Sequence, residues 1–303
     1  MVIMESIAYS PGHITGVVQP YEYLDDPIKS GSKGIGFSIQ KGVTTQVNIS
    51  KSKISELKIE INDQITHNAI VSEYVAKSFV SKINRNLKIR IKHQVDIPIG
   101  SGFGTSGAAA LSLALALNQV LELGLSRIES AKMAHIAEIV CKTGLGTVLA
   151  ELNGDFEVRE KQGAPGIGKI SKIPYNGDYW MVALELGTQS TELMLQELRR
   201  KNEITKLGEQ YVILFLANRS VKNFLNLSKR FSQLINIHHK LKNAAKEADD
   251  RGFVCGIALF GNTLFSLVRQ NEVKELKRVF AKYKTYNENI IVSQIEKRGA
   301  RLL

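Results

Sequence analysis

The stretch Pro98-Ile-Gly-Ser-Gly-Phe-Gly-Thr-Ser-Gly-Ala-Ala-Ala110 is the most informative part of this 303-residue chain. Its glycines allow the backbone to fold closely around an anion, and its hydroxyl side chains add hydrogen-bonding groups. An Ala- and Leu-rich segment follows at residues 107–123 and predicts a buried helix. The unpaired N–H groups and the dipole at the start of a helix attract phosphate. The stretch therefore predicts a phosphate-binding loop, and a flexible glycine turn is the alternative.

Two common nucleotide motifs fit this stretch poorly. The P-loop requires Gly-Lys-Ser/Thr, and no lysine follows Gly107. The dinucleotide fingerprint GxGxxG is met literally by Gly102, Gly104 and Gly107, but it belongs after a buried parallel strand. Here the preceding strand is amphipathic and ends at Pro98, and the helix is followed by a second helix instead of a strand.

The rest of the chain predicts a mixed α and β protein with a boundary near residue 168. A strand is expected to enter a Pro-Gly turn within residues 6–16, and residues 27–42 are expected to form a glycine-rich loop. Period-two alternation and apolar runs predict strands at 43–49, 54–61, 87–95, 179–186, 211–217, 254–260, 263–268 and 289–295. Helical patterns predict helices at 68–84, 107–123, 126–142, 190–201, 220–235, 238–251 and 271–282. Another glycine-rich segment covers residues 143–168.

Composition limits the classes of partner. Lys plus Arg exceed Asp plus Glu by 40 to 29, which gives a formal charge of +11. This excess fits a solvated surface, attraction of an anionic substrate or a nucleic-acid partner. The basic residues form no long run, and no aromatic RNA-binding signature is present, so we expect no nucleic acid. Two cysteines, no signal peptide and no apolar stretch of membrane-spanning length predict a cytoplasmic protein without a membrane partner.

Three segments resemble the GHMP kinases (galactokinase, homoserine kinase, mevalonate kinase and relatives). The stretch from Pro98 resembles the family's phosphate motif, Pro-x-x-x-Gly-x-Gly-x-Ser-Ser/Gly-Ala. Ser10-Pro-Gly-His-Ile-Thr-Gly resembles the first motif, and Gly256-Ile-Ala-Leu-Phe-Gly-Asn-Thr resembles the third. Within the superfamily the chain is most similar to the archaeal pantoate kinases, which also have a Gly-Ser-x-Gly-x-Gly loop like the one at Gly31.

This resemblance implies an α+β, two-domain GHMP kinase fold. A ribosomal protein S5 domain 2-like ATP-binding domain is expected at residues 1–168, and a ferredoxin-like domain at 169–303. The implied activity is phosphorylation of the pantoate hydroxyl to 4-phosphopantoate, on the route to coenzyme A, with ATP and Mg²⁺ as cofactors. A sibling kinase for mevalonate, a phosphomevalonate or homoserine is the first alternative. A nucleotide-binding protein without catalysis on the same fold is the second, and a homodimer is possible.

The resemblance also assigns the nucleotide and metal residues. Ser106 and Glu138 are the implied magnesium ligands and catalytic groups, although Glu138 could instead face solvent and pair with Lys142. Several GHMP kinases place an Asp shortly after this Glu as a candidate base, whereas Thr147 stands there in this chain. Either no protein base is used or the substrate differs; Asp155 is a nearby carboxylate. The implied ATP-binding residues are Pro98, Gly100, Ser101, Gly102, Gly104, Thr105, Ser106 and Gly107.

Three cationic residues are implied around the acidic acceptor. Arg159 resembles an arginine of the pantoate site, and a guanidinium can hold a carboxylate through two parallel hydrogen bonds. His13 and Lys33 lie in two other segments expected around the acceptor. Each of the three has an alternative as an ordinary structural or solvated residue.

Overall fold

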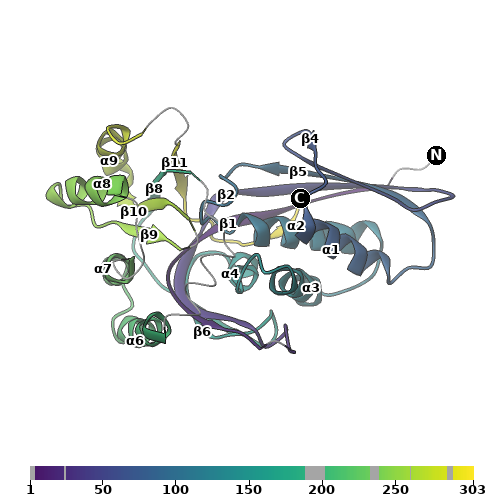
Figure 1. Cartoon of the computed structure of the whole chain (residues 1–303), viewed down its shortest axis with the longest axis horizontal. Coiled ribbons are helices and arrows are strands. Elements are labelled where there is room, and N and C mark those ends of the chain that lie inside the picture. Colours follow the sequence, from purple (N-terminus) through teal and green to yellow (C-terminus); the bar gives the residue numbers. More distant parts are fainter. Residues whose placement is uncertain (1–3, 24, 188–201, 233–238, 260, 285–288) are drawn as a thin grey trace.

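The computed structural model describes residues 4–23, 25–187, 202–232, 239–259, 261–284 and 289–303. These residues form an elongated molecule with one sheet and its helices toward each end (Figure 1). None of the helices in these ranges has the length and apolar character that a membrane crossing requires.

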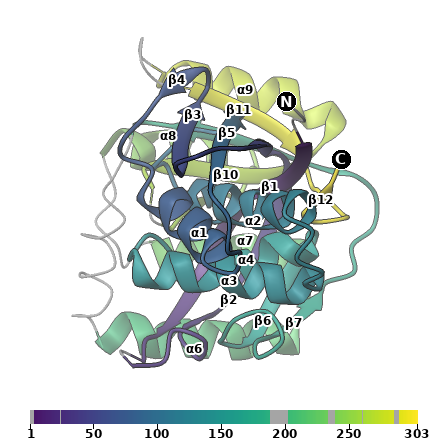
Figure 2. The ribbon, with the colours of Figure 1, turned by 90° about the vertical axis from the view of Figure 1, so that its right-hand side faces the viewer.

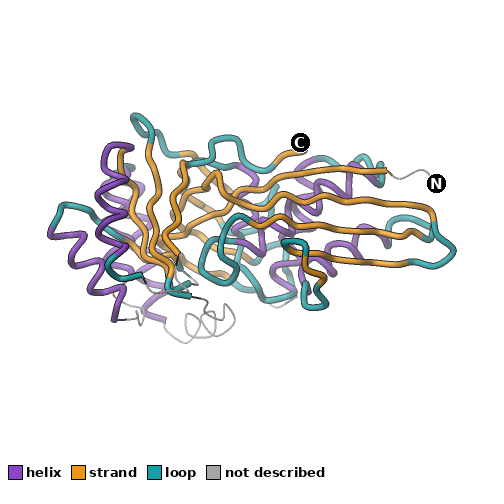
Figure 3. Tube along the Cα trace, turned by 90° about the horizontal axis from the view of Figure 1, so that it is seen from above, coloured by secondary structure: helices purple, strands orange, loops and turns teal. Residues whose placement is uncertain are grey.

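The first sheet has eight strands and is built on two long ones, β1 and β2, which run along much of the molecule (Figure 3). Its central order is β12-β1-β2-β5-β3-β4, and β6 joins β2 to β7. Helices α1 to α4 pack together against it (Figure 2). The strands are β1 (Met4–Tyr21), β2 (Gly31–Lys51), β3 (Glu56–Ile61), β4 (Gln64–Ile65), β5 (Leu87–Val95), β6 (Phe156–Lys161), β7 (Lys169–Lys172) and β12 (Arg301–Leu302). The helices are α1 (Ile70–Val80), α2 (Thr105–Val120), α3 (Arg127–Val140) and α4 (Thr147–Asn153).

The second sheet has the strand order β11-β8-β10-β9, with every pair antiparallel. In chain order this is 4-1-3-2, the arrangement of a ferredoxin-like domain, so that prediction is confirmed. Its strands are β8 (Tyr179–Glu185), β9 (Gly256–Ala258), β10 (Thr263–Arg269) and β11 (Asn289–Gln294). The accompanying helices are α6 (Asn202–Ala217), α7 (Val221–Ser232), α8 (His239–Asp250), the short 3₁₀ helix η1 (Gln270–Glu272) and α9 (Val273–Ala281).

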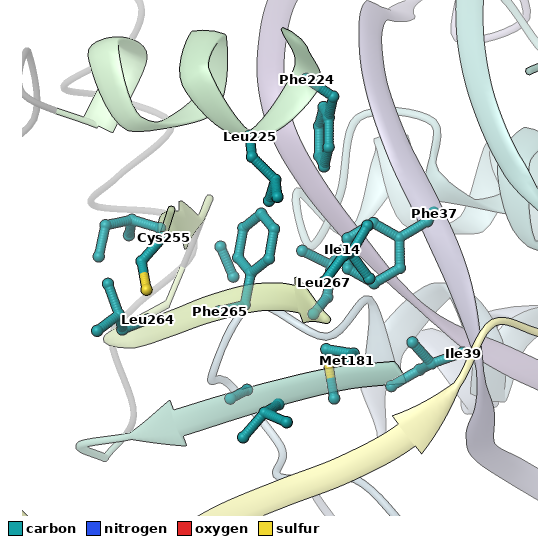
Figure 4. Close-up of a cluster of buried hydrophobic side chains, with 14 of the residues drawn as sticks. Ile14, Phe37, Ile39, Met181, Phe224, Leu225, Cys255, Leu264, Phe265 and Leu267 are labelled. Atoms are coloured by element: carbon teal, nitrogen blue, oxygen red, sulfur yellow. The ribbon is translucent and has the colours of Figure 1, made fainter. Parts of the chain in front are cut away.

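Both sheets contribute to one apolar core (Figure 4). Phe37 of β2 contacts both Phe224 of α7 and Phe265 of β10, with ring centroids 6.0 and 5.5 Å away. Phe156 of β6 also contacts Phe224, at 5.2 Å. The two halves of the molecule are therefore held together by buried aromatic side chains.

Four predictions of local structure are wrong or incomplete. Residues 211–217 are the second half of α6 and not a strand: Val212 and Phe215 are buried while Ile213 and Leu214 are exposed, which is helical spacing. Residues 31–42 belong to β2 and are not a loop. The Pro-Gly segment stays within β1, and the register shifts between Pro11 and Gly12 because Gln40 and Lys41 of β2 have no partner in β1. Gly42 lets β2 approach Ser10 closely. The glycine-rich segment 143–168 contains α4 and β6, and the helix expected at 190–201 lies outside the described residues.

No strand is expected from the sequence at β4, β7 or β12, whereas the remaining described helices and strands, apart from those corrected above, overlap the predicted ranges. In β5, for example, Leu87, Ile89 and Ile91 are buried while Lys88 and Arg90 are exposed. Residue 168 does not separate the strands of the two sheets. β7 follows this residue in the chain and still pairs with β6 of the first sheet. The division at 168 therefore stays a prediction.

Candidate active site

A cavity of about 370 Å³ lies between the glycine loop, the start of α1 and the end of α3. Gly100, Gly102 and Gly104 have φ values of +75°, +87° and +66°, so the loop uses the left-handed region that glycine adopts at little cost. Gly104 is also the N-cap of α2, whose first turn faces the cavity through Thr105 and Ser106. The loop thus presents backbone and a helix N-terminus to the cavity, as an anion site requires.

Not every residue assigned to the nucleotide faces this cavity. Gly100, Gly102, Gly104, Thr105 and Ser106 line it. The residues that do not line it are Pro98, Ser101 and Gly107. Pro98 accepts a hydrogen bond from Thr105 Oγ1 at 3.1 Å through its carbonyl, so it shapes the loop from outside.

Ser101 attaches the loop to the second sheet. Its side chain is fully buried, and its Oγ donates to Glu185 Oε1 at 2.9 Å. Its carbonyl accepts from Thr263 Oγ1 at 2.7 Å. Gly261 packs so closely that a Cβ there would lie 2.1 Å from the Ser101 carbonyl oxygen. We call Ser101, Glu185 and Thr263 the loop clamp.

Glu138 faces the cavity beside two hydroxyl groups. Its side chain is 1% exposed and its Oε2 accepts a hydrogen bond from Thr147 Oγ1 at 3.1 Å. Burial raises the pKa of Glu138 to about 7. No described lysine or arginine pairs with this carboxyl to lower the pKa again. Ser106 Oγ donates to Thr143 Oγ1 at 2.9 Å, which leaves its lone pairs available. The alternative of a solvent-facing Glu138 paired with Lys142 is therefore wrong.

Sequence reasoning missed Glu151. This residue of α4 is fully buried, and neither carboxylate oxygen has a hydrogen-bond partner in the described structure. Burial and the neighbouring Glu138 raise the pKa of Glu151 well above its usual range. The signal was available, since Glu151 follows Thr147 by four residues and so shares its helix face. It lay in a segment expected to be irregular.

A buried charged cluster lies on the other side of His13. His13 lines the cavity, and its Nε2 lies 2.8 Å from Glu157 Oε1. Burial lowers the pKa of His13, which favours the neutral ring. Arg159 donates to the same Glu157 oxygen at 2.7 Å and to Thr15 Oγ1 at 3.2 Å. Arg159 is 1% exposed, so it is not the exposed strand arginine of the alternative.

Lys33 and Asp155 are not brought to the cavity. Lys33 Nζ lies 5.2 Å from the centre of the Tyr21 ring, in a cation–π contact. Asp155 accepts from the hydroxyl of Tyr175 at 3.0 Å and lines a different, shallower hollow. It is therefore part of a turn, and a role for Asp155 as the base of this site is not supported.

The end of the cavity away from His13 is apolar. Its walls combine aliphatic side chains with the polar groups of Ser72 and His93, which contact each other at 3.1 Å. Burial lowers the pKa of His93 to about 4, so its ring is neutral. A flat aromatic base with hydrogen-bonding edges fits such walls. The aliphatic residues of the cavity wall include Ile61, Val71, Val95, Ile99 and Ala109.

Comparison with known proteins identifies the family. Residues 68–154, which carry the glycine loop, α2, Glu138 and Glu151, match the family described as "GHMP kinases N terminal domain". Residues 68–154 are therefore a GHMP kinase N-terminal domain. The chain is an ATP-dependent kinase, which confirms the predicted enzyme class.

Similar proteins cover nearly the whole chain. The pantoate kinase of Methanocaldococcus jannaschii is 29% identical over 88% of this chain and 94% of its own length. That of Thermococcus kodakarensis is 29% identical over 90% and 91%. A solved "phosphotransferase related to CoA biosynthesis pathway" is 27% identical, with a TM-score of 0.87 over 99% of this chain and 98% of its own. Homoserine kinase from Cytophaga hutchinsonii, 15% identical over 99% of this chain and 97% of its own, shares the fold with a TM-score of 0.74.

Proposed function

We propose that this kinase is a pantoate kinase, which transfers the γ-phosphoryl group of ATP to the hydroxyl of pantoate and forms 4-phosphopantoate for coenzyme A synthesis. The observation that carries the proposal is the similarity to pantoate kinases along some nine-tenths of the chain. The cavity supports it, because one continuous space joins the glycine loop, Glu138 and His13. We expect the reaction in the cytoplasm, and a homodimer stays a prediction.

The glycine loop would hold the triphosphate. Backbone N–H groups of the loop and the first turn of α2 neutralise phosphate charge, and the apolar end of the cavity accommodates the base. Thr105 keeps the loop closed on Pro98, while Ser101 keeps it attached to Glu185. These contacts leave the main chain of the loop free to point at the nucleotide. Phosphoryl transfer depends mainly on such positioning and on charge neutralisation.

The residues present fit a magnesium ion. Mg²⁺ takes hard oxygen ligands and is usually held by one or two carboxylates together with substrate phosphates. Ser106 and Glu138 both line the cavity, and Glu138 is a buried carboxylate without a described cationic partner. When bound, the ion would neutralise charge that develops on the transferred phosphoryl group. Ser106 and Glu138 are the residues that would hold it.

The acceptor would lie on the side of His13. His13 is held by Glu157, and Glu157 is held in turn by Arg159, so the orientation of the ring is fixed. We propose that this cluster receives the carboxylate end of the acceptor and that Lys33 contributes only after a rearrangement. Thr147 stands where the resemblance implies an Asp, so we propose that the acceptor hydroxyl loses its proton without a carboxylate at that position.

An ATP-consumption assay with pantoate, pantothenate, mevalonate and homoserine tests the proposal. We expect turnover at low concentration only with pantoate, and a product whose mass corresponds to 4-phosphopantoate. Preference for mevalonate or homoserine would replace pantoate by that acceptor. Binding of ATP without turnover of any acceptor would favour a nucleotide-binding protein that has lost catalysis.

A further inference from the structure

Glu151 is the most unusual polar group in the described structure. A carboxylate that is fully buried and accepts no hydrogen bond is costly, so such groups are normally paired or bound to a metal. It lies directly beneath the glycine loop: a Cβ on Gly104 would be 2.6 Å from Glu151 Oε1. Packing alone does not explain why an acid occupies this position.

Glu151 converges with Glu138 and Thr147 on one small space. A Cβ added to Gly107 would lie 2.6 Å from Thr147 Oγ1, 2.8 Å from Glu151 Oε2 and 3.1 Å from Glu138 Oε2. Because Gly107 has no side chain, the space between these three oxygens stays open. The hydroxyl of Thr147 donates to Glu138, and it also lies close enough to Glu151 to oppose, in part, the rise in the pKa of that carboxyl.

No described lysine or arginine is bound directly to this group of oxygens, although the charge of Arg159 opposes part of the rise in the pKa of Glu151. The nearest described candidate is Arg159, and its guanidinium is already bound to Glu157 and Thr15. Two buried carboxylates beside a triphosphate would repel it unless a positive ion lies between them. Two carboxylates together with phosphate oxygens are a donor set that Mg²⁺ accepts.

We propose that Glu151 is a positioning residue of the magnesium site, where it holds a second negative charge behind Glu138 and takes the place of a carboxylate at position 147. The inference rests on the proposed function, in that magnesium is bound at Ser106 and Glu138. Residues 147 and 151 are one helical turn apart on α4, so an acid can move between them and stay on the same face.

The test is a titration of Mn²⁺, used as the probe for Mg²⁺, with the free ion measured by electron paramagnetic resonance. The non-hydrolysable analogue AMP-PCP saturates the protein and no acceptor is added. Outer partners of metal ligands are typically worth about 10–100-fold in affinity, so Glu151→Gln should weaken Mn²⁺ binding by about tenfold or more. Thr147→Asp in the Glu151→Gln background should restore it. Glu160→Gln is the matched control, since Glu160 pairs with Lys169 on β7 away from the cavity.

Unchanged Mn²⁺ affinity in a folded Glu151→Gln protein would overturn the proposal. A purely structural role would move the melting temperature and leave the Mn²⁺ affinity as it was. The glutamine amide of Glu151→Gln could itself prevent folding, because it would be buried without a partner. In that case Glu151→Met, which has a similar volume and needs no polar partner, is titrated with Mn²⁺ instead. The titration measures metal binding and not turnover, so its result does not depend on the acceptor. A chain that phosphorylates another acid would still show the effect of Glu151 on Mn²⁺ affinity. Conversely, if the chain phosphorylates pantoate but Glu151→Gln leaves Mn²⁺ affinity unchanged, the role of Glu151 would be contradicted and the proposed function would stand.

Discussion

Position 107 tolerates no side chain, because three oxygens surround the place where a Cβ would stand. Helix propensity alone favours alanine over glycine in α2 by about 1 kcal/mol. Overpacking of a tight site costs about 1–3 kcal/mol, and here it also displaces Thr147, Glu138 and Glu151. We expect Gly107→Ala to lower the free energy of unfolding and to weaken ATP binding. Urea denaturation and calorimetric titration with ATP measure the two effects, and a more stable variant with normal ATP affinity would contradict them.

His93 predicts a dependence of stability on pH. Among the described residues, its ring nitrogens form hydrogen bonds only with the hydroxyls of Thr45 and Ser72, and burial lowers its pKa to about 4. The unfolded chain therefore binds a proton below pH 6.5 that the folded chain takes up only near pH 4. Stability conferred by the neutral ring is complete above pH 6.5 and falls by about 1.4 kcal/mol per pH unit on acidification between these values.

In His93→Gln this contribution is absent. We expect the difference in unfolding free energy between the wild type and the variant to shrink from pH 7 to pH 4.5. The wild type is the more stable at pH 7. His135, whose pKa burial also lowers to about 4, should keep part of the acid sensitivity in both proteins. A difference that does not change with pH would show that His93 is not neutral in the folded state.

Among the elements, the junction of β8 and β10 with the glycine loop is the most consequential. Glu185 is the last residue of β8 and pairs in register with Thr263, the first of β10. Both hold Ser101, so the end of the second sheet sets the position of a loop in the first. A hydrogen bond to a charged group is worth about 1.5–3 kcal/mol. Ser101→Ala should therefore lower stability and raise the Kd for ATP more than it lowers kcat.

The control for this variant is Ser171→Ala. Ser171 Oγ donates to Glu160 at 2.8 Å, a bond of the same kind that lies away from the cavity. Both variants should lose stability, and only Ser101→Ala should lose ATP affinity. Equal ATP affinity in the two proteins would mean that the loop clamp does not position the loop.

The sequence predicts elements well where periodicity is strong, as in β5 and α2, and poorly where glycines have another purpose. Gly34, Gly36 and Gly42 allow close strand approach within β2, but in sequence they are typical of a loop. The apolar run 211–217 has strand-like composition, and only the alternation of Val212 and Phe215 with exposed neighbours reveals a helix. Of the residues that line the cavity, motif resemblance named Ser106, Glu138 and His13. The spacing of Glu151 from Thr147 was a local signal, but its burial beside Glu138 and the contacts of Ser101 with Glu185 and Thr263 depend on distant segments, which no local pattern contains.

The whole molecule should unfold as one unit, because its two sheets share a core. Phe224 of α7 contacts Phe37 and Phe156 of the first sheet and Phe265 of the second. Truncation of a buried Phe to Ala typically costs about 3–5 kcal/mol. We expect Phe224→Ala to lower the temperature of a single calorimetric transition and to weaken ATP binding in parallel. Two separate transitions, with ATP stabilising only one of them, would show instead that the halves are energetically independent.

The pairing of β12 with β1 has a consequence for protein synthesis. The two strands lie side by side (Figure 2). Ala8 lies opposite Leu302, and the amide of Ala300 donates to the carbonyl of Glu151 at 3.0 Å. The first sheet can thus be completed only after residue 302 has left the ribosome, long after β1 and β2 have emerged. Until then Ala8 and Tyr9 at the edge of β1 are open to pairing with other chains. Nascent chains stalled with residues 296–303 inside the exit tunnel should exchange the amide protons of these residues and of α4 rapidly, and their emergence should protect both segments together.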